Sequence, residues 1–105
     1  MKINYEIIRK AGENIVVNDL QRFGWKIDKL KQENGKPELI IAKKEETIII
    51  LWVNVVVTPE KPVSLNNEEV KRLKLLAEQR KAAAFHVKVI LEKDKNEKKI
   101  NYAIL

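Results

Sequence analysis

Residues 47–57 read TIIILWVNVVV, and this stretch decides the fold. Its many β-branched residues favour a strand over a helix. The apolar side chains run on without alternation, which is typical of a strand that is buried on both faces. We therefore predict a central strand over 47–57. The same stretch is too short to span a bilayer as a helix, and it contains Asn54.

Two strands are predicted on the N-terminal side of the central strand, over 25–31 and 38–43. Asn34-Gly35 between them is a strong signal for a tight turn, because both residues accept a positive φ. A polar turn at 44–46 then leads into the central strand. The first half of the chain therefore predicts antiparallel strands joined by short turns.

A helix is predicted before these strands. From residue 13 onward, apolar residues recur on one helical face as far as Phe23, and Gly24 stands where a C-terminal cap belongs. Upstream the pattern is ambiguous, because residues 3, 5 and 7 alternate as in a strand while 8, 11 and 15 have helical spacing. The start of the helix, before or after Gly12, therefore stays open.

The C-terminal half predicts a helix and two more strands. Asn66 and Glu69 have the spacing of a capping box, and the helix is expected to run to about Lys81. Alternating apolar residues then predict two strands joined by a charged turn, at 85–91, 94–98 and 100–104.

The predicted order is α-β-β-β-α-β-β in a single domain over residues 1–105. The connection from the central strand through the second helix is long enough for a right-handed crossover, which makes the strands at its two ends parallel. The other strands can pair as antiparallel hairpins. The sequence therefore predicts an α/β fold, with a mixed β-sheet flanked by helices.

Composition restricts the possible functions. The chain has no cysteine and one histidine, which excludes disulfides, thiolate metal sites and any metal site that needs two imidazoles. Acids and bases are mixed near the N-terminus, unlike a signal peptide. We expect a cytoplasmic protein that makes no membrane contact.

The net charge points to a polyanionic partner. The chain has 21 Lys and Arg against 15 Asp and Glu, a formal net charge of +6. Such an excess favours nucleic acid through counterion release. A thermophilic surface rich in Lys and Glu would have the same composition, so the charge alone leaves both explanations open.

Three stretches resemble archaeal Holliday junction resolvases and related PD-(D/E)XK nucleases. RKAGENIVVNDLQRFGWKI (9–27) is similar to their first helix, and KPELIIAKK (36–44) to the strand that bears their Pro-Asp step. VSLNNEEVKRLKLLAEQRKAAAFHVKVIL (63–91) is similar to their crossover helix and following strand. The resemblance implies a restriction-endonuclease-like fold.

The chemistry of that family needs two or three carboxylates and a lysine around a divalent metal ion. The resemblance places the Pro-Asp step at Pro37-Glu38 and a Glu-x-Lys step on the next strand, in the region of Trp52 and Asn54. Residues 47–58 contain no acid and no lysine. The resemblance therefore implies a degenerate nuclease site with no cofactor, in which Glu38 is a remnant.

An active endonuclease is the rival hypothesis. It would use a displaced set of acids, with Glu38 joined by Glu13 or Glu46, and it would need Mg²⁺. Glu13 lies near the position of the family's helical acid, but it is not in register with the usual spacing.

Two stretches also resemble the C-terminal domain of tRNA-splicing endonucleases, at 18–27 and 78–105. The catalytic set of that family is Tyr, His and Lys. Lys81 is a candidate match for the lysine, but no histidine precedes the central strand. This resemblance implies a structural subunit that works with a catalytic partner subunit.

The expected partners are nucleic acid, as a DNA junction or structured RNA, and either further copies of this chain in a homo-oligomer or a catalytic partner subunit. The candidate phosphate-binding residues are Lys26, Lys29, Lys71, Lys74, Arg80 and Lys81. The candidate interface residues are Ile100, Tyr102 and Ile104, because little sequence remains to cover this apolar strand.

Two further side chains are expected to have structural roles. His86 is predicted to be half-exposed, on the face opposite Phe85, Val87 and Val89, with no acid placed to work with it. Trp52 is predicted to fill the core.

Overall fold

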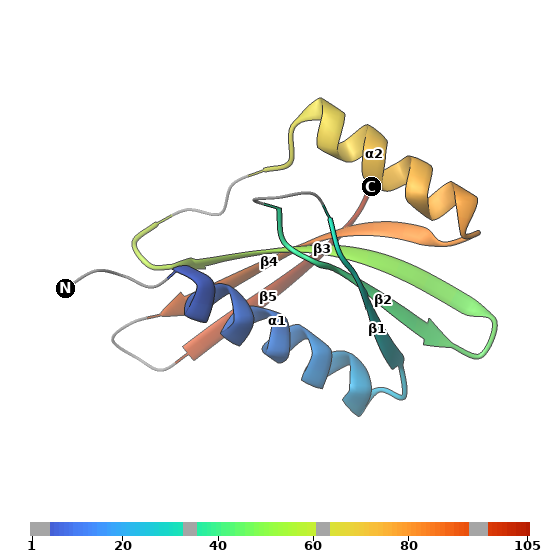
Figure 1. The fold of residues 1–105 in the computed structure, drawn as a ribbon. Coiled ribbons are helices and arrows are strands. Elements are labelled where there is room, and N and C mark those ends of the chain that lie inside the picture. Colours follow the sequence, from blue (N-terminus) through green and yellow to red (C-terminus); the bar gives the residue numbers. More distant parts are fainter. Residues whose placement is uncertain (1–4, 33–35, 61–63, 93–96) are drawn as a thin grey trace.

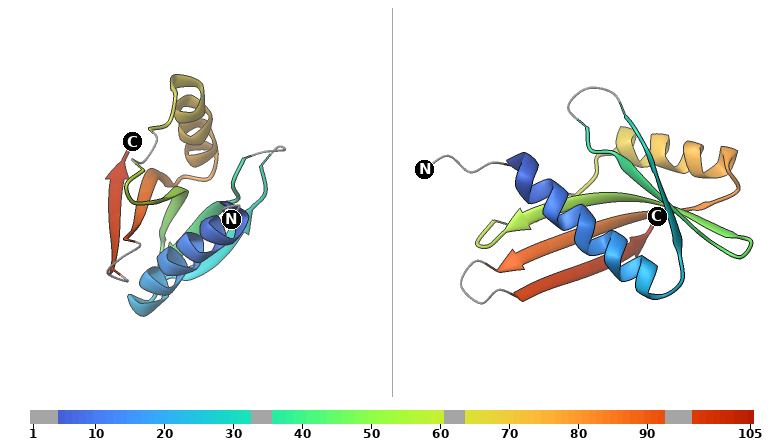
Figure 2. Two further views of the ribbon diagram at one scale, coloured as in Figure 1. Left: turned by 90° about the vertical axis from the view of Figure 1, so that its left-hand side faces the viewer. Right: turned by 60° about the horizontal axis from the view of Figure 1, so that its bottom comes forward.

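The computed structural model describes residues 5–32, 36–60, 64–92 and 97–105. Its elements are α1 (Tyr5–Arg22), β1 (Lys26–Leu30), β2 (Leu39–Lys44), β3 (Thr47–Val57), α2 (Asn67–Gln79), β4 (Ala83–Glu92) and β5 (Glu97–Ile104). The predicted order is confirmed. The strands form one twisted sheet, with α1 on one face and α2 on the other (Figure 1, Figure 2).

The strands lie side by side in the order β1-β2-β3-β4-β5. β3 and β4 run parallel, with Ile49 beside Ala83 and Val57 beside Leu91. All other neighbours are antiparallel. The central position of β3, its bounds and its parallel partner are therefore as predicted.

Alternation along the strands divides the apolar core between the two faces of the sheet. The cluster on the α1 side consists of Val16, Leu20, Ile40, Ala42, Leu51, Val53, Val87 and Val89. The cluster on the α2 side consists of Leu39, Ile50, Trp52, Leu73, Ala77 and Ala84. Trp52 is buried, as predicted for a core residue. These two clusters fix which face each neighbouring side chain occupies.

Gly12 lets α1 lie directly on β3. A Cβ atom at this position would overlap the side chain of Val55. The helix begins at Tyr5, so the strand-like alternation upstream was misleading. It ends where Gly24 adopts a φ of +91° and donates from its N–H to the carbonyl of Gln21, which confirms the predicted cap.

Both ends of α2 have well-defined caps. At its start, the Asn66 side chain accepts from the Glu69 N–H at 2.8 Å and the Glu69 carboxylate accepts from the Asn66 N–H at 3.0 Å, which is the predicted capping box. At its end, Ala82 N–H donates to the Ala77 carbonyl at 2.7 Å, and Lys81 has a φ of 53°. This is a Schellman motif, and it ends the helix at Gln79, before the predicted Lys81.

Two predicted turns have different outcomes. Asn34-Gly35 lies outside the described residues. The charged turn expected over 94–98 is wrong at its C-terminal end, because Lys98 belongs to β5 and pairs with Leu91. The residues that extend the pairing of β4 with β5 are charged, so no alternation of apolar residues in the sequence indicated a strand there. In the described part of the chain, neither helix is apolar and long enough to cross a membrane.

Candidate functional site

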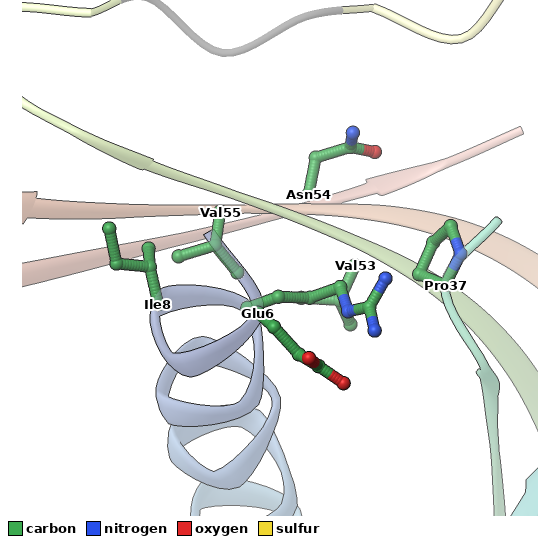
Figure 3. A pocket seen from close by; sticks show the side chains of 7 residues that line it. Glu6, Ile8, Pro37, Val53, Asn54 and Val55 are labelled. Atoms are coloured by element: carbon green, nitrogen blue, oxygen red, sulfur yellow. The ribbon is translucent and has the colours of Figure 1, made fainter. Parts of the chain in front are cut away.

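An open groove of about 560 Å³ lies on the α1 side of the sheet, between the start of α1, the residues before β2, and β3 (Figure 3). The residues around it are Glu6, Ile8, Arg9, Pro37, Val53, Asn54 and Val55. The side chain of Asn54 points away from the groove, to the other side of β3 (Figure 3). The surface that β3 gives to the groove is therefore formed by valine side chains.

Glu13 is the buried acid next to this groove, with 6% of its surface exposed. Its Oε1 lies 4.0 Å from Nε of Arg9, one helical turn earlier. Burial raises the pKa of Glu13, and the negative charge of Glu38 raises it further, while Lys29, Arg9 and Lys10 act in the opposite direction. Glu13 and Glu38 are thus close enough to interact electrostatically.

Strand register explains why these groups meet. Lys29 on β1 pairs with Ile40 on β2, and Ile40 packs in the cluster on the α1 side. Glu38 precedes Ile40 by two residues and so shares its face. Helix α1 and the first two strands therefore place Glu13, Lys29 and Glu38 on the same side of the sheet. The sequence predicted Glu38 as the remnant and offered Glu13 only in the rival endonuclease hypothesis, because the spacing of Glu13 did not fit the family pattern.

The residues of β3 that face the acids are not those that the resemblance indicated. Leu51 pairs with Ile40, so the positions on the same face farther along β3 are Val53 and Val55. Trp52 and Asn54 lie on the α2 side. The prediction for this step was displaced by one residue, and in a strand that displacement changes the face.

Two other predicted site residues lie far from this groove. Glu46 immediately precedes β3 and stands seven residues from Val53, or about 23 Å at the usual rise of a strand. Lys81 follows the C-terminal end of α2 on the other side of the sheet. In the described residues, no group of three or more His, Cys, Asp or Glu side chains is arranged to hold a metal ion.

His86 is buried, with 5% of its surface exposed, so the predicted half-exposure is wrong. It does lie opposite the face of Val87 and Val89, where α2 covers it. Its Nε2 is 2.8 Å from Oδ1 of Asn54, which accepts the hydrogen bond when Nε2 carries the proton. Burial lowers the pKa of His86, Lys88 lowers it further, and Glu69 opposes this.

The six predicted phosphate-binding residues are all exposed, but they do not share one face. Lys29 lies on the α1 side with the two acids. Lys26 lies on the α2 side, because Leu30 of the same strand face packs in the α2-side cluster. Lys71 and Lys74 are on α2, and Arg80 and Lys81 follow its end. Lys43 pairs directly with Lys26. This pair was not predicted from the sequence, because the two residues are 17 apart in sequence and no local pattern indicates that they lie opposite one another.

β5 is an edge strand, as predicted, and its apolar side chains differ in exposure. Ile100 packs against the α1-side cluster. Tyr102 donates a hydrogen bond of 2.8 Å to Asp19 of α1, and burial together with this bond raises the pKa of Tyr102 well above its usual range. Ile104 is 70% exposed. The expectation that little covers this strand is thus wrong for Ile100, whereas Tyr102 is exposed apart from the bond to Asp19. Pairing with another chain stays a prediction.

Residues 7–103 match a family described as a domain of unknown function, DUF8840. The chain belongs to the DUF8840 family. No curated protein sequence matches it.

Among solved structures, this DUF8840 domain is similar to Hjc of Archaeoglobus fulgidus, a Holliday junction resolvase from an archaeal hyperthermophile. The TM-score is 0.57 at 19% sequence identity, and the similarity covers 84% of this chain and 73% of Hjc. At this identity the similarity establishes the fold. The DUF8840 domain therefore has a nuclease-like α/β fold, as the sequence predicted.

Proposed function

We propose that this DUF8840 domain binds nucleic acid as a non-catalytic subunit built on a nuclease-like scaffold. The groove on the α1 side carries this proposal. Glu13 and Glu38 lie on this side of the sheet and interact electrostatically, while β3 contributes Val53 and Val55 to the same face. The scaffold thus keeps two acids and offers apolar side chains where metal-dependent cleavage needs a further carboxylate and a cation.

Two carboxylates of this kind do not fit a catalytic Mg²⁺ site. Mg²⁺ requires near-ideal octahedral oxygen coordination and is reluctant to lose water. Arg9 lies beside Glu13, and burial favours the neutral form of that acid. A buried acid that already lies near a cation holds a divalent ion weakly. The valines of β3 add neither an oxygen ligand nor a charge near a scissile phosphate.

The charge of the domain supports the binding half of the proposal. The formal net charge is +6, and Lys29, Arg9 and Lys10 all act electrostatically on Glu13. A phosphate backbone approaching either face would meet exposed lysines and release counterions. The structural neighbour is a Holliday junction resolvase, so a four-way DNA junction is the first probe to use.

An active endonuclease that uses Glu13 with Glu38 is the second candidate. The observation that favours it is that Glu13 and Glu38 lie on the same side of the sheet and that the charge of Glu38 raises the pKa of Glu13, which the sequence spacing did not indicate. Mg²⁺ sites in phosphate-processing enzymes can contain one or two protein carboxylates with substrate oxygens completing the shell. The two candidates differ in whether the isolated chain forms product.

A structural subunit of a tRNA-splicing endonuclease is a further form of the same binding proposal. Lys81 follows α2, Tyr102 binds Asp19 on the opposite side of the sheet, and His86 is buried against Asn54. These side chains are too dispersed to act as one catalytic set. A catalytic partner subunit would have to supply the chemistry, and its presence in a pull-down from the source organism would support this form.

The test combines binding and cleavage on the full chain. A fluorescein-labelled four-way junction, a matched duplex and a hairpin tRNA precursor are titrated at several salt concentrations and then incubated with Mg²⁺ or EDTA. We expect binding that weakens steeply with salt and no Mg²⁺-dependent product. Product that disappears in Glu38→Ala and in Glu13→Gln would establish the endonuclease instead. Absence of binding at low salt would reject both candidates.

A further inference from the structure

Lys26 and Lys43 are direct cross-strand neighbours at the end of the β1–β2 pair. Both are exposed, and both lie on the α2 side, because Leu30 and Ile41 of the same strand faces pack in the α2-side cluster. Neither forms an ion pair with any residue that the structure describes. Like charges in direct opposition destabilise a sheet, so the fold itself gains nothing from this pair.

The same row of the sheet continues toward the end of α2. Lys43 pairs with Ile48 of β3, and Ala82 lies one residue before the pairing of Ile49 with Ala83. Three strand spacings, or about 14 Å, therefore separate the backbone of Lys26 from that of Ala82. Lys81 and Arg80 immediately precede Ala82, so four cations occupy one end of the α2 side.

The cations at the two ends of this row have different structural explanations. Arg80 and Lys81 follow the C-terminal end of α2, where the helix dipole stabilises positive charge. The Lys26–Lys43 pair has no such compensation. The acid on the same strand face is Asp28, and its Oδ1 accepts from the Lys29 N–H at 2.8 Å. Glu45 and Glu46 form the turn between β2 and β3 at the same end of the sheet, but among the described residues neither pairs with Lys26 or Lys43. An anionic ligand would remove the repulsion between the two opposed lysines.

We infer that the phosphate backbone of a nucleic acid binds across the α2 side of the sheet, at Lys26, Lys43, Arg80 and Lys81. The inference rests on the proposed function and specifies where it occurs. It places the contact on the face opposite Glu13 and Glu38, so the basic surface and the acid groove are on different sides of one sheet. Phosphate contacts of this kind position a nucleic acid without reading its sequence.

Lys26→Glu in the full chain tests the inference, because it has opposite effects on stability and binding. It converts a repulsive cross-strand pair into an attractive one, so Tm should rise by roughly 1 to 5 °C. Affinity for the labelled four-way junction should fall roughly tenfold in 0.1 M salt, and the salt slope should decrease by about one. Lys43→Glu should have the same two effects.

Lys98→Glu is the matched control. Lys98 is exposed, carries the same charge and lies on β5 at the far edge of the sheet. Because it is farther than a screening length from the patch, its replacement should change affinity by about twofold or less. Lys81→Gly is a second test variant, since glycine is favoured at a φ of 53° and the change removes only the charge. It should bind more weakly than wild type without loss of Tm.

The outcomes separate the inference from the proposed function. If the wild-type chain binds no nucleic acid at low salt, the proposed function fails. If it binds, but Lys26→Glu and Lys43→Glu weaken binding no more than Lys98→Glu does, the inference fails alone. A larger loss in Lys29→Glu than in Lys26→Glu would move the contact to the α1 side and overturn the inference as well.

Discussion

The two sides of the sheet bury their polar groups in different ways. On the α1 side, Glu13 is an acid beside an open groove, with a second acid, Glu38, in electrostatic reach. On the α2 side, His86 and Asn54 form a closed hydrogen-bonded pair beneath a helix. The first arrangement can change when a ligand or a proton arrives, whereas the second is satisfied within the fold. A buried polar residue is thus a functional candidate on one side and a structural element on the other.

The largest expected effect comes from disrupting the packing of α1 on β3. Gly12→Val forces a branched side chain into Val55, so we expect a loss of about 3 kcal/mol in the free energy of unfolding. Chemical denaturation of the variant and the wild type measures it. Ala11→Val, at an exposed position of the same helix, is the control and should cost well under 1 kcal/mol. A loss in Gly12→Val no larger than that in Ala11→Val would show that the contact with β3 does not require glycine at this position.

The sequence predicted the helices and strands correctly, but it did not predict which side chains share a face of the sheet. The unbroken apolar run of β3, the capping box at Asn66 and the cap at Gly24 are local signals, and each specified its element. The site depends instead on register, which only the pairing of Ile40 with Leu51 reveals. Because the predicted register was displaced by one residue, Trp52 and Asn54 were expected at positions that Val53 and Val55 occupy in the structure.

Burial of the polar pair was also beyond sequence reasoning. His86 alternates with apolar residues, which is the usual pattern of a strand with one solvated face. The packing of α2 over that face overrides the pattern. A hydrogen-bond partner 32 residues away, on a parallel strand, then makes burial tolerable. No local feature of the sequence reports such a partner.

Removing one member of the closed pair should have the next largest effect. Asn54→Ala leaves the buried ring of His86 without its partner, so we expect a loss of about 2 kcal/mol in the free energy of unfolding. Urea denaturation measures this. The double change Asn54→Ala with His86→Leu removes both polar groups and should recover part of the loss. If the double variant is less stable than Asn54→Ala, the hydrogen bond to Asn54 is not what offsets the free-energy cost of burying His86.

The two sides should respond to pH with opposite signs. The pKa of Glu13 is raised above 4.5 by burial, so its contribution to stability is present at lower pH and is lost as pH rises through the raised value. The pKa of His86 is lowered below 6.5 by burial, so its contribution is present above 6.5 and is lost as pH falls through the lowered value.

Single variants separate these two contributions. Relative to wild type, Glu13→Gln should gain stability as pH rises from 4 toward 7, since glutamine has no charge to bury. His86→Gln should lose less stability than wild type as pH falls from 7 toward 4. Denaturation midpoints across this range measure both slopes. Identical pH profiles for wild type and a variant would show that the replaced residue does not contribute to the pH dependence of stability.

The smallest effect is expected from Glu38→Ala, and it sharpens the comparison most. Glu38 lies at the groove on the α1 side, while the inferred phosphate contacts are on the α2 side, so junction binding should change by about twofold or less. The sign is fixed by charge, because removing an acid near phosphates can only favour binding.

The same change should move the pKa of Glu13 back toward its ordinary value, since Glu38 contributes to raising it. Titration of the Glu13 carboxyl by NMR, alongside junction binding in the same samples, measures both effects. A lowered Glu13 pKa with unchanged binding would separate the acid groove from the nucleic-acid surface. A large gain in affinity would instead place the nucleic acid over the groove, where removing an acid acts directly on the phosphates.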